Sequence, residues 1–208
     1  MRAKNVSEPE TAPKKSSDLF QKRQKQIIQK AMKLFMKKGY AQTSMREISK
    51  ATAIDIRNLY YFIKNKEEIL FLVFDRLHRP EVQMFEKKGI LDIDDPVEQL
   101  RAAIAGLVEN GYGYGQEVLL LYRESKSLPK RLLKNILEKE SRVVSHIENI
   151  LKKGCARGVF AIEDTSFTAN MITYQLSLYA LRKWNMKKYT KRRIIDLMEQ
   201  NILKMVGH

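Results

Sequence analysis

The sequence predicts an all-α protein with a small N-terminal helical domain and a larger C-terminal one. Apolar residues recur at a spacing of three or four through most of the 208 residues, as they do on one face of a helix. Capping sequences precede these segments, and Gly or Pro interrupts them. Because no segment alternates apolar and polar residues as a strand would, we expect about nine helices and no sheet.

Composition divides the chain into three parts. Residues 1–17, MRAKNVSEPETAPKKSS, contain almost nothing to bury, which predicts a disordered arm. Short helical segments follow in residues 18–65, and longer amphipathic ones fill residues 66–208. We therefore expect a small helical domain over 18–65 and a second helical domain over 66–208.

Each helix of the first domain has a start or stop signal. An apolar face runs from Phe20 to Phe35, and Gly39 is a plausible C-terminal stop. Ser44-Met45-Arg46-Glu47 is a capping box that opens a helix to about Ala51. Asp55 caps a third helix, which covers Ile56 to roughly Phe62.

The second domain has comparable signals. Helix starts are expected at Asn65, at Asp95-Pro96 and at Asp164, a break or kink near Pro80, an interruption at GYGYG (111–115), a long helix through 133–151 that closes near Gly154, and two C-terminal helices at about 164–182 and 190–206.

Positive charge is concentrated in the first third of the chain. The net charge is +15, and residues 18–80 carry 14 Lys and Arg against 6 Asp and Glu, whereas residues 81–208 carry 21 against 16. A basic domain beside a nearly balanced one indicates a polyanionic partner, most simply nucleic acid. The alternative is a basic surface that only keeps the protein in solution.

Several classes of function find no support in the sequence. Cys155 is the only cysteine, and the three histidines lack metal-ligand spacing, so no disulfide or metal site is expected. No nucleophile with its base and no phosphate-binding Gly-rich loop is apparent, so we expect neither an enzyme nor a cofactor. The chain has no apolar signal core and no run of about 20 apolar residues, which predicts a cytoplasmic protein without a membrane segment.

Two short helices joined by Thr52-Ala53-Ile54 follow a supporting helix, which is the arrangement of a helix-turn-helix. The segment FMKKGYAQTSMREISKATAIDIRNLYYFIKNKEEIL resembles the DNA-binding domain of the TetR family of bacterial repressors. The matching pieces are KGY at 38–40, TSMREIS at 43–49, LYYF at 59–62 and KNKEEIL at 64–70. Ala53 stands where the family usually has Gly, which predicts strain of up to ~1 kcal/mol in the turn. Phe62 stands where His is common.

The resemblance implies that helix 56–62 enters the major groove of DNA. Arg and Asn side chains can pair with purine edges, and Tyr can stack or touch a thymine methyl. The expected base-reading residues are Arg46, Arg57, Asn58 and Tyr61. The expected phosphate contacts are Thr43, Ser44, Tyr60, Lys64 and Lys66. The alternatives are that Arg57 and Asn58 are only solvated and that Tyr60 mainly packs within the domain.

The resemblance also implies that the C-terminal helices form a homodimer and enclose a pocket for a small effector. The helices at 164–182 and 190–206 suit a four-helix dimer interface. The candidate pocket residues are Tyr112, Leu119, Tyr122, Arg123, Met171, Tyr174, Leu176 and Tyr179. Ordinary core packing is the alternative for the apolar and aromatic ones, and pairing with neighbours at a helix surface is the alternative for Arg123.

The predicted function is a ligand-responsive repressor of a palindromic double-stranded DNA operator, released by a small hydrophobic effector. LLYRESKSLP at 120–129 is similar to a stretch in TetR-family members that respond to acyl-coenzyme A thioesters. The basic excess of this domain favours an effector with an anionic head. A lipophilic drug that relieves repression of an efflux pump is one alternative, and sequence-independent nucleic-acid binding is another.

Overall fold

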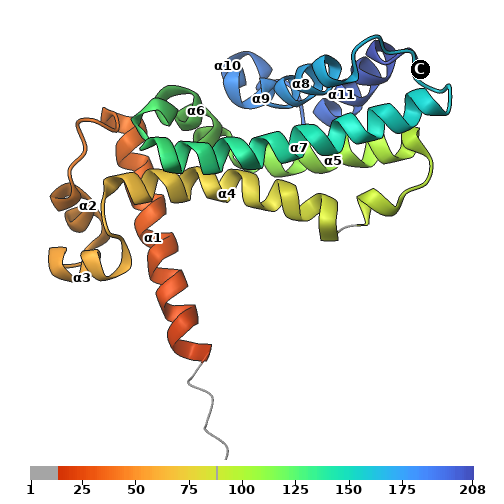
Figure 1. Cartoon of the computed structure of the whole chain (residues 1–208). Coiled ribbons are helices and arrows are strands. Elements are labelled where there is room, and N and C mark those ends of the chain that lie inside the picture. Colours follow the sequence, from red (N-terminus) through yellow and green to blue (C-terminus); the bar gives the residue numbers. More distant parts are fainter. Residues whose placement is uncertain (1–13, 88) are drawn as a thin grey trace, which may run out of the picture.

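All regular structure in the described part of the chain is helical (Figure 1). The computed structural model describes residues 14–87 and 89–208. Its helices are α1 (Lys14–Lys38), α2 (Met45–Thr52), α3 (Ile56–Phe62), α4 (Lys66–Lys87), α5 (Pro96–Gly113), α6 (Gly115–Glu124), α7 (Lys130–Ala156), α8 (Thr165–Leu176), α9 (Leu178–Leu181), α10 (Lys183–Met186) and α11 (Lys191–Met205), with 3₁₀ turns η1 (Ile90–Asp92) and η2 (Ser125–Ser127). The all-α prediction is confirmed.

The predicted helix starts are present as hydrogen bonds. The Ser44 hydroxyl accepts from the Glu47 N–H, while the Glu47 carboxylate accepts from the Ser44 N–H at 2.8 Å, which completes the capping box of α2. Asp55 accepts from the Arg57 N–H at 2.9 Å at the start of α3. Gly39, with φ +92°, ends α1 as predicted. Of the predicted arm, residues 1–13 lie outside the described residues, and α1 already begins at Lys14.

The helices form an elongated molecule with α2 and α3 at one end (Figure 1). Helices α4, α5 and α7 pack side by side along its length, and α8 and α11 pack against α7 and α5 at the other end. The core under α2 and α3 is formed by α1 residues such as Ile27 and Phe35 together with Ile48 and Leu59. This core also includes Leu120 of α6, so the two domains share buried contacts.

Helix α4 connects the two ends and continues through Pro80, so of the expected break or kink the break is wrong. Proline removes one backbone hydrogen bond and usually costs a helix ~3 kcal/mol. Beyond it, Met84 and Phe85 are buried in the C-terminal core, and this packing holds the helix to its end. The first half of α4, with Leu70 and Phe74, belongs to the core under α2 and α3.

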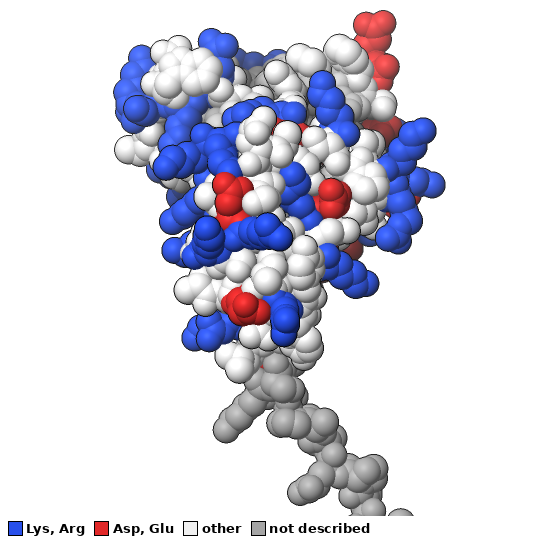
Figure 2. Space-filling view, turned by 90° about the vertical axis from the view of Figure 1, so that its left-hand side faces the viewer, with Lys and Arg blue, Asp and Glu red and all other residues white. Residues whose placement is uncertain are grey.

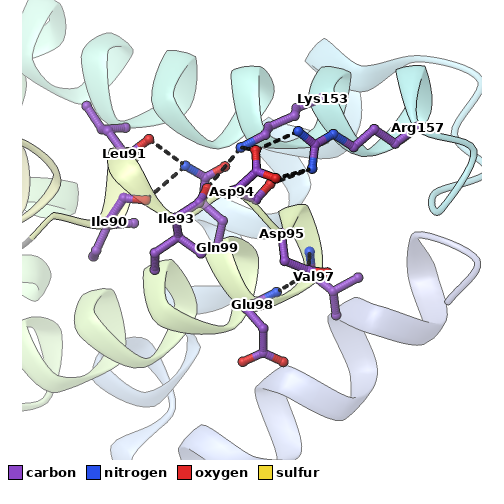
Figure 3. A network of polar contacts seen from close by, with 10 residues as sticks. All are labelled: Ile90, Leu91, Ile93, Asp94, Asp95, Val97, Glu98, Gln99, Lys153 and Arg157. Carbon is purple, nitrogen blue, oxygen red and sulfur yellow. Dashed lines mark hydrogen bonds and ion pairs between the residues drawn. The ribbon is translucent and has the colours of Figure 1, made fainter.

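A polar network fixes the segment between η1 and α5 to the C-terminal end of α7 (Figure 3). The Arg157 guanidinium donates to both carboxylate oxygens of Asp94, at 2.6 and 3.1 Å, and Lys153 Nζ donates to the Ile93 carbonyl at 2.9 Å. Hydrogen bonding to Arg157 lowers the pKa of Asp94. Gln99 Nε2 donates to the Ile90 carbonyl at 2.8 Å. The end of the molecule opposite α2 and α3 is therefore held by several directed contacts.

The two C-terminal helices differ from the prediction in continuity. The segment expected as one helix over 164–182 ends as α8 at Leu176 and resumes as the short α9 after Ser177. The Ser177 N–H bonds the Tyr174 carbonyl, three residues back, at 3.0 Å, so the helix tightens and is interrupted there. The helix expected over 190–206 is present as α11, with Thr190 as its cap.

Candidate functional site

The turn between α2 and α3 sets the angle at which α3 is presented. Ala53 has φ +54° and ψ +33°, the left-handed conformation that favours glycine, and it ends α2. The Ser49 hydroxyl donates to the Ile54 carbonyl at 2.6 Å and closes the turn from the other side. The strain predicted from Ala53 thus has a structural basis. Ala53 carries a Cβ in a left-handed backbone conformation, which costs an L-residue about 1–2 kcal/mol.

Helix α3 buries one side and exposes the other. Leu59 is fully buried in the core, whereas Arg57 and Asn58 are exposed. Tyr61 is 74% exposed and Tyr60 is 50% exposed. Figure 2 shows this end of the molecule, where Lys and Arg side chains outnumber the acidic ones. The sequence-predicted base readers, Arg46 of α2 included, are therefore all free to reach a ligand outside the protein.

The predicted phosphate contacts fall into two groups. Lys64 and Tyr60 are exposed. Thr43 is buried, and its hydroxyl donates to the Gly39 carbonyl at 2.8 Å while its N–H donates to the Tyr40 carbonyl at 3.1 Å, so both of its donors are used inside the protein. This placement corrects the expectation for Thr43, whose role here is to hold the loop between α1 and α2.

Ser44 and Lys66 also make internal contacts. The Ser44 hydroxyl and N–H both donate to the Glu47 carboxylate, at 2.8 Å each. Lys66 Nζ donates to the Tyr40 carbonyl at 2.9 Å and lies 4.3 Å from the centroid of the Tyr40 ring. The ammonium group thereby ties the start of α4 to the loop after α1, a role that the sequence did not indicate.

A cavity of about 340 Å³ lies among α4, α5, α6, α7, α8 and α9. Four of the predicted pocket residues line it, namely Tyr122, Met171, Tyr174 and Leu176. The prediction missed the contribution of α4 and α7, which supply Leu77, His78, Glu81, Glu140, Val143 and Val144. The apolar periodicity of α4 and α7 marks a buried face, but nothing in it distinguishes a core from a cavity wall.

The other four predicted pocket residues lie elsewhere. Val118, Leu121 and Tyr122 face the cavity at helical spacing on α6, so Leu119 and Arg123 fall on another side of that helix. Tyr112 and Tyr179 stack on each other with ring centroids 4.4 Å apart and pack against the C-terminal core. For these four residues the alternative of ordinary packing or solvation fits the structure.

The cavity lining contains carboxylates and no Lys or Arg among the described residues. This does not support the expectation of an anionic head group, which rested on the charge of the whole domain. Within residues 14–87 and 89–208, His, Cys, Asp and Glu side chains form no cluster of three that could hold a metal ion. No helix in the described ranges has the length and apolar character needed to span a bilayer.

Two family models match the chain at the two parts of this architecture. Residues 27–73, which contain α2 and α3, match the model described as bacterial regulatory proteins of the tetR family. Residues 93–180, which supply most of the cavity, match the model described as the tetracyclin repressor-like C-terminal domain. The chain belongs to the TetR family.

Two curated TetR-family relatives are transcriptional regulators by name. The chain is 26% identical over 209 residues to the HTH-type transcriptional regulator HbdR of Aromatoleum sp. (strain CIB), across 98% of this chain and 86% of that protein. It is 26% identical over 136 residues to the HTH-type transcriptional repressor NicS of Pseudomonas putida (strain KT2440), across 64% of each. The chain is therefore a TetR-family helix-turn-helix regulator of transcription.

Solved structures support the TetR fold over most of the chain. A TetR-family regulatory protein from Rhodococcus RHA1 superposes with a TM-score of 0.81 at 20% identity, over 89% of this chain and 97% of that one. AibR, solved in complex with isovaleryl coenzyme A and operator DNA, superposes with a TM-score of 0.70 at 26% identity, over 85% of this chain and 96% of that one.

Proposed function

We propose that this TetR-family protein is a homodimeric repressor that binds a palindromic operator and is released from it by a small hydrophobic effector. The observation that carries the proposal is the burial pattern of α3. Leu59 is buried in the core, while Arg57, Asn58 and Tyr61 are exposed to solvent. One such helix offers few base contacts, so two are needed for a specific site. In a dimer, the two α3 helices reach successive major grooves about 34–36 Å apart.

Direct base contacts are assigned to Arg46, Arg57, Asn58 and Tyr61. Arg pairs with guanine O6 and N7, and Asn pairs with adenine N6 and N7. Lys64 and Tyr60 contact phosphates, since Tyr60 is exposed on α3 and Lys64 is exposed just after it. Lys66 and Ser44 act on DNA mainly through the loop that they hold, because their polar groups already have partners.

The dimer interface is assigned to the outer sides of α8 and α11. These helices lie next to each other, with Gln175 Nε2 3.6 Å from Met205 Sδ. Met205 of α11 is 36% exposed there, and Leu178 of α9, which follows α8, is 40% exposed. Exposed apolar groups on these helices suit the two-fold four-helix packing proposed from the sequence.

The effector class is supported by two different observations. AibR, a structural relative, is complexed with isovaleryl coenzyme A, which favours an acyl thioester. The carboxylates of Glu81 and Glu140 in the cavity favour the second candidate, a lipophilic cation of the kind that efflux-pump repressors recognise.

Helices α4 and α6 provide the connection between the cavity and DNA. On α4, Leu77 and His78 line the cavity, and Leu70 lies in the core beneath α3. An effector weakens operator binding only if it binds the conformation that does not fit the operator more tightly. A pivot of α4 changes the separation of the two α3 helices, so specific binding is lost more than non-specific binding.

The experiment is a selection of binding sites from random DNA, followed by titration of the resulting complex with acyl-coenzyme A thioesters and with lipophilic cations. We expect one palindromic site and its release by one of the two classes. Equal affinity for every DNA sequence would instead favour a sequence-independent DNA-binding protein. A monomer in light scattering at micromolar concentration would contradict the dimer.

A further inference from the structure

The polar side of the cavity is acidic. His78 and Glu81 lie one turn apart on α4, and Glu140 comes from α7. Glu81 and Glu140 carry two negative charges between them, while His78 can carry at most one positive charge. The titratable acids and bases of the lining are therefore net negative whichever protonation state His78 adopts.

Two basic side chains that are next to cavity residues in the sequence are committed to another group. Arg79 and Lys139, which precede or follow the cavity residues in the sequence, both contact the buried Asp75, with Arg79 at 2.5 Å. Asp75 is 3% exposed and contacts both cations. Among the described residues, Glu140 has no ion-pair partner.

His78 adds an unpartnered buried atom. It is 5% exposed, and its Nδ1 lies 3.1 Å from the Glu81 carboxylate. Its Nε2 is buried and has no hydrogen-bond partner within the described part of the chain. A buried polar atom without a partner is costly, so a cavity lined by such an atom is suited to a ligand that brings a polar group.

Aromatic rings complete the surroundings of the carboxylates. Tyr122, Phe167 and Tyr174 line the same cavity, and their exposed fractions are 50%, 66% and 58%. The faces of aromatic rings attract cations, and their area covers an apolar chain. Leu77, Val118 and Val143 supply the apolar floor.

We propose that the cavity binds a lipophilic monocation, an apolar molecule with a protonated or quaternary ammonium head placed against Glu81 and Glu140. This inference deepens the proposed function and rests on it only in treating the cavity as the effector site. A carboxylate or phosphate head is rejected because it would enter a net negative site with no Lys or Arg in its lining.

The test is calorimetry of the full chain, without DNA, using octyl chains that differ only in their heads. The probes are octyltrimethylammonium, 1-octanol, octanoate and octanoyl-coenzyme A, all below their micellar concentrations. We expect the ammonium to bind at least about tenfold more tightly than octanol, and octanoate to bind most weakly. Tightest binding of octanoate or of octanoyl-coenzyme A would overturn the proposal.

Two variants and a control assign the effect to the carboxylates. Glu140→Gln and Glu81→Gln should each reduce ammonium affinity about tenfold or more while leaving octanol affinity within about threefold. Glu138→Gln, an exposed residue of α7 outside the cavity lining, should leave all affinities unchanged. Ammonium binding that survives both cavity variants would show that the site lies elsewhere.

Operator binding separates this inference from the proposed function. If octyltrimethylammonium binds but does not release the operator, the cavity assignment stands and the induction mechanism fails. If another compound releases the operator while the ammonium does not bind, the repressor assignment stands and the monocation is wrong.

Discussion

The ring of Phe20 stands edge-on to the ring of Tyr61, with their centroids 5.8 Å apart. Phe20 also lies 5.2 Å from the Phe62 ring, and Gln24 Nε2 donates to the Phe62 carbonyl at 3.3 Å. Helix α1 therefore braces the C-terminal end of α3. Tyr61 is 74% exposed, so the contact with Phe20, together with its edge-on contact with Phe62, limits the orientations of a proposed base reader.

Phe20→Ala should weaken operator binding with little loss of fold stability. Aromatic pairs contribute about 0.5–1.5 kcal/mol, and a freed Tyr61 must be ordered again on DNA at a similar cost. Fluorescence anisotropy with the selected operator measures the loss, which we expect at about 1 kcal/mol. Leu19→Ala, at an exposed neighbouring position, is the control. Equal losses for both variants would remove the bracing role.

Ala53→Gly should stabilise the protein by up to about 1 kcal/mol, because glycine relieves the left-handed strain but gains freedom in the unfolded chain. Chemical denaturation reports the change. Ala51→Gly, inside α2, should act in the opposite direction by a similar amount. A destabilised Ala53→Gly variant would mean that the turn does not carry the strain assigned to it.

Replacing Glu47 by Gln should remove a stabilisation that depends on pH. Hydrogen bonding to Lys38, followed by the Ser44 N–H, lowers the pKa of Glu47 from 4.5 to about 2. A lowered folded-state pKa gives a contribution that is full above about pH 4.5 and is lost as the pH falls towards 2. The difference in Tm between wild type and Glu47→Gln should therefore shrink across that window.

Gln can still complete the capping box, so the comparison isolates the charge. A difference that stays constant down to pH 2 would show that the carboxylate charge is not the cause.

Arg57→Ala and Asn58→Ala should each cost about 1–3 kcal/mol on the selected operator and much less on random DNA. Lys64→Ala should weaken both kinds of DNA alike and lower the salt dependence by about one counterion. Binding measured at several salt concentrations separates the two behaviours. If Arg57→Ala loses the same affinity on both DNAs, Arg57 contacts phosphate and does not read bases.

Lys66→Ala should lower fold stability as well as DNA affinity. Its ammonium bonds the Tyr40 carbonyl and lies over the Tyr40 ring, so its removal loosens the loop before α2. Thermal unfolding without DNA checks this, and Lys64→Ala, which is exposed, is the control. An unchanged Tm for Lys66→Ala would restore the purely DNA-directed role expected from the sequence.

Local signals explain why much of the fold was predictable. Ser44, Asp55 and Asp95 cap the helices that they were expected to cap, because capping depends on neighbours within three residues. The path of α4 past Pro80 was not predictable, since it depends on burial of Phe85 by distant helices. The cavity was not predictable either, because His78 and Glu140 line it together only through the packing of α4 against α7. Tyr112 and Tyr179 were predicted as pocket residues because they are aromatic, but their rings stack on each other.

Helix α6 places neighbouring residues in two different environments. Val118 faces the cavity, and Leu120, two positions later, is fully buried in the core that supports α3. A substitution that reshapes the cavity on α6 should therefore also disturb the core that supports α3. Evolution towards a new effector is freer at the cavity positions of α8, where Phe167 and Met171 are exposed and contact no part of that core. Divergence among descendants of this protein should accordingly accumulate at these positions of α8 while α6 stays nearly fixed.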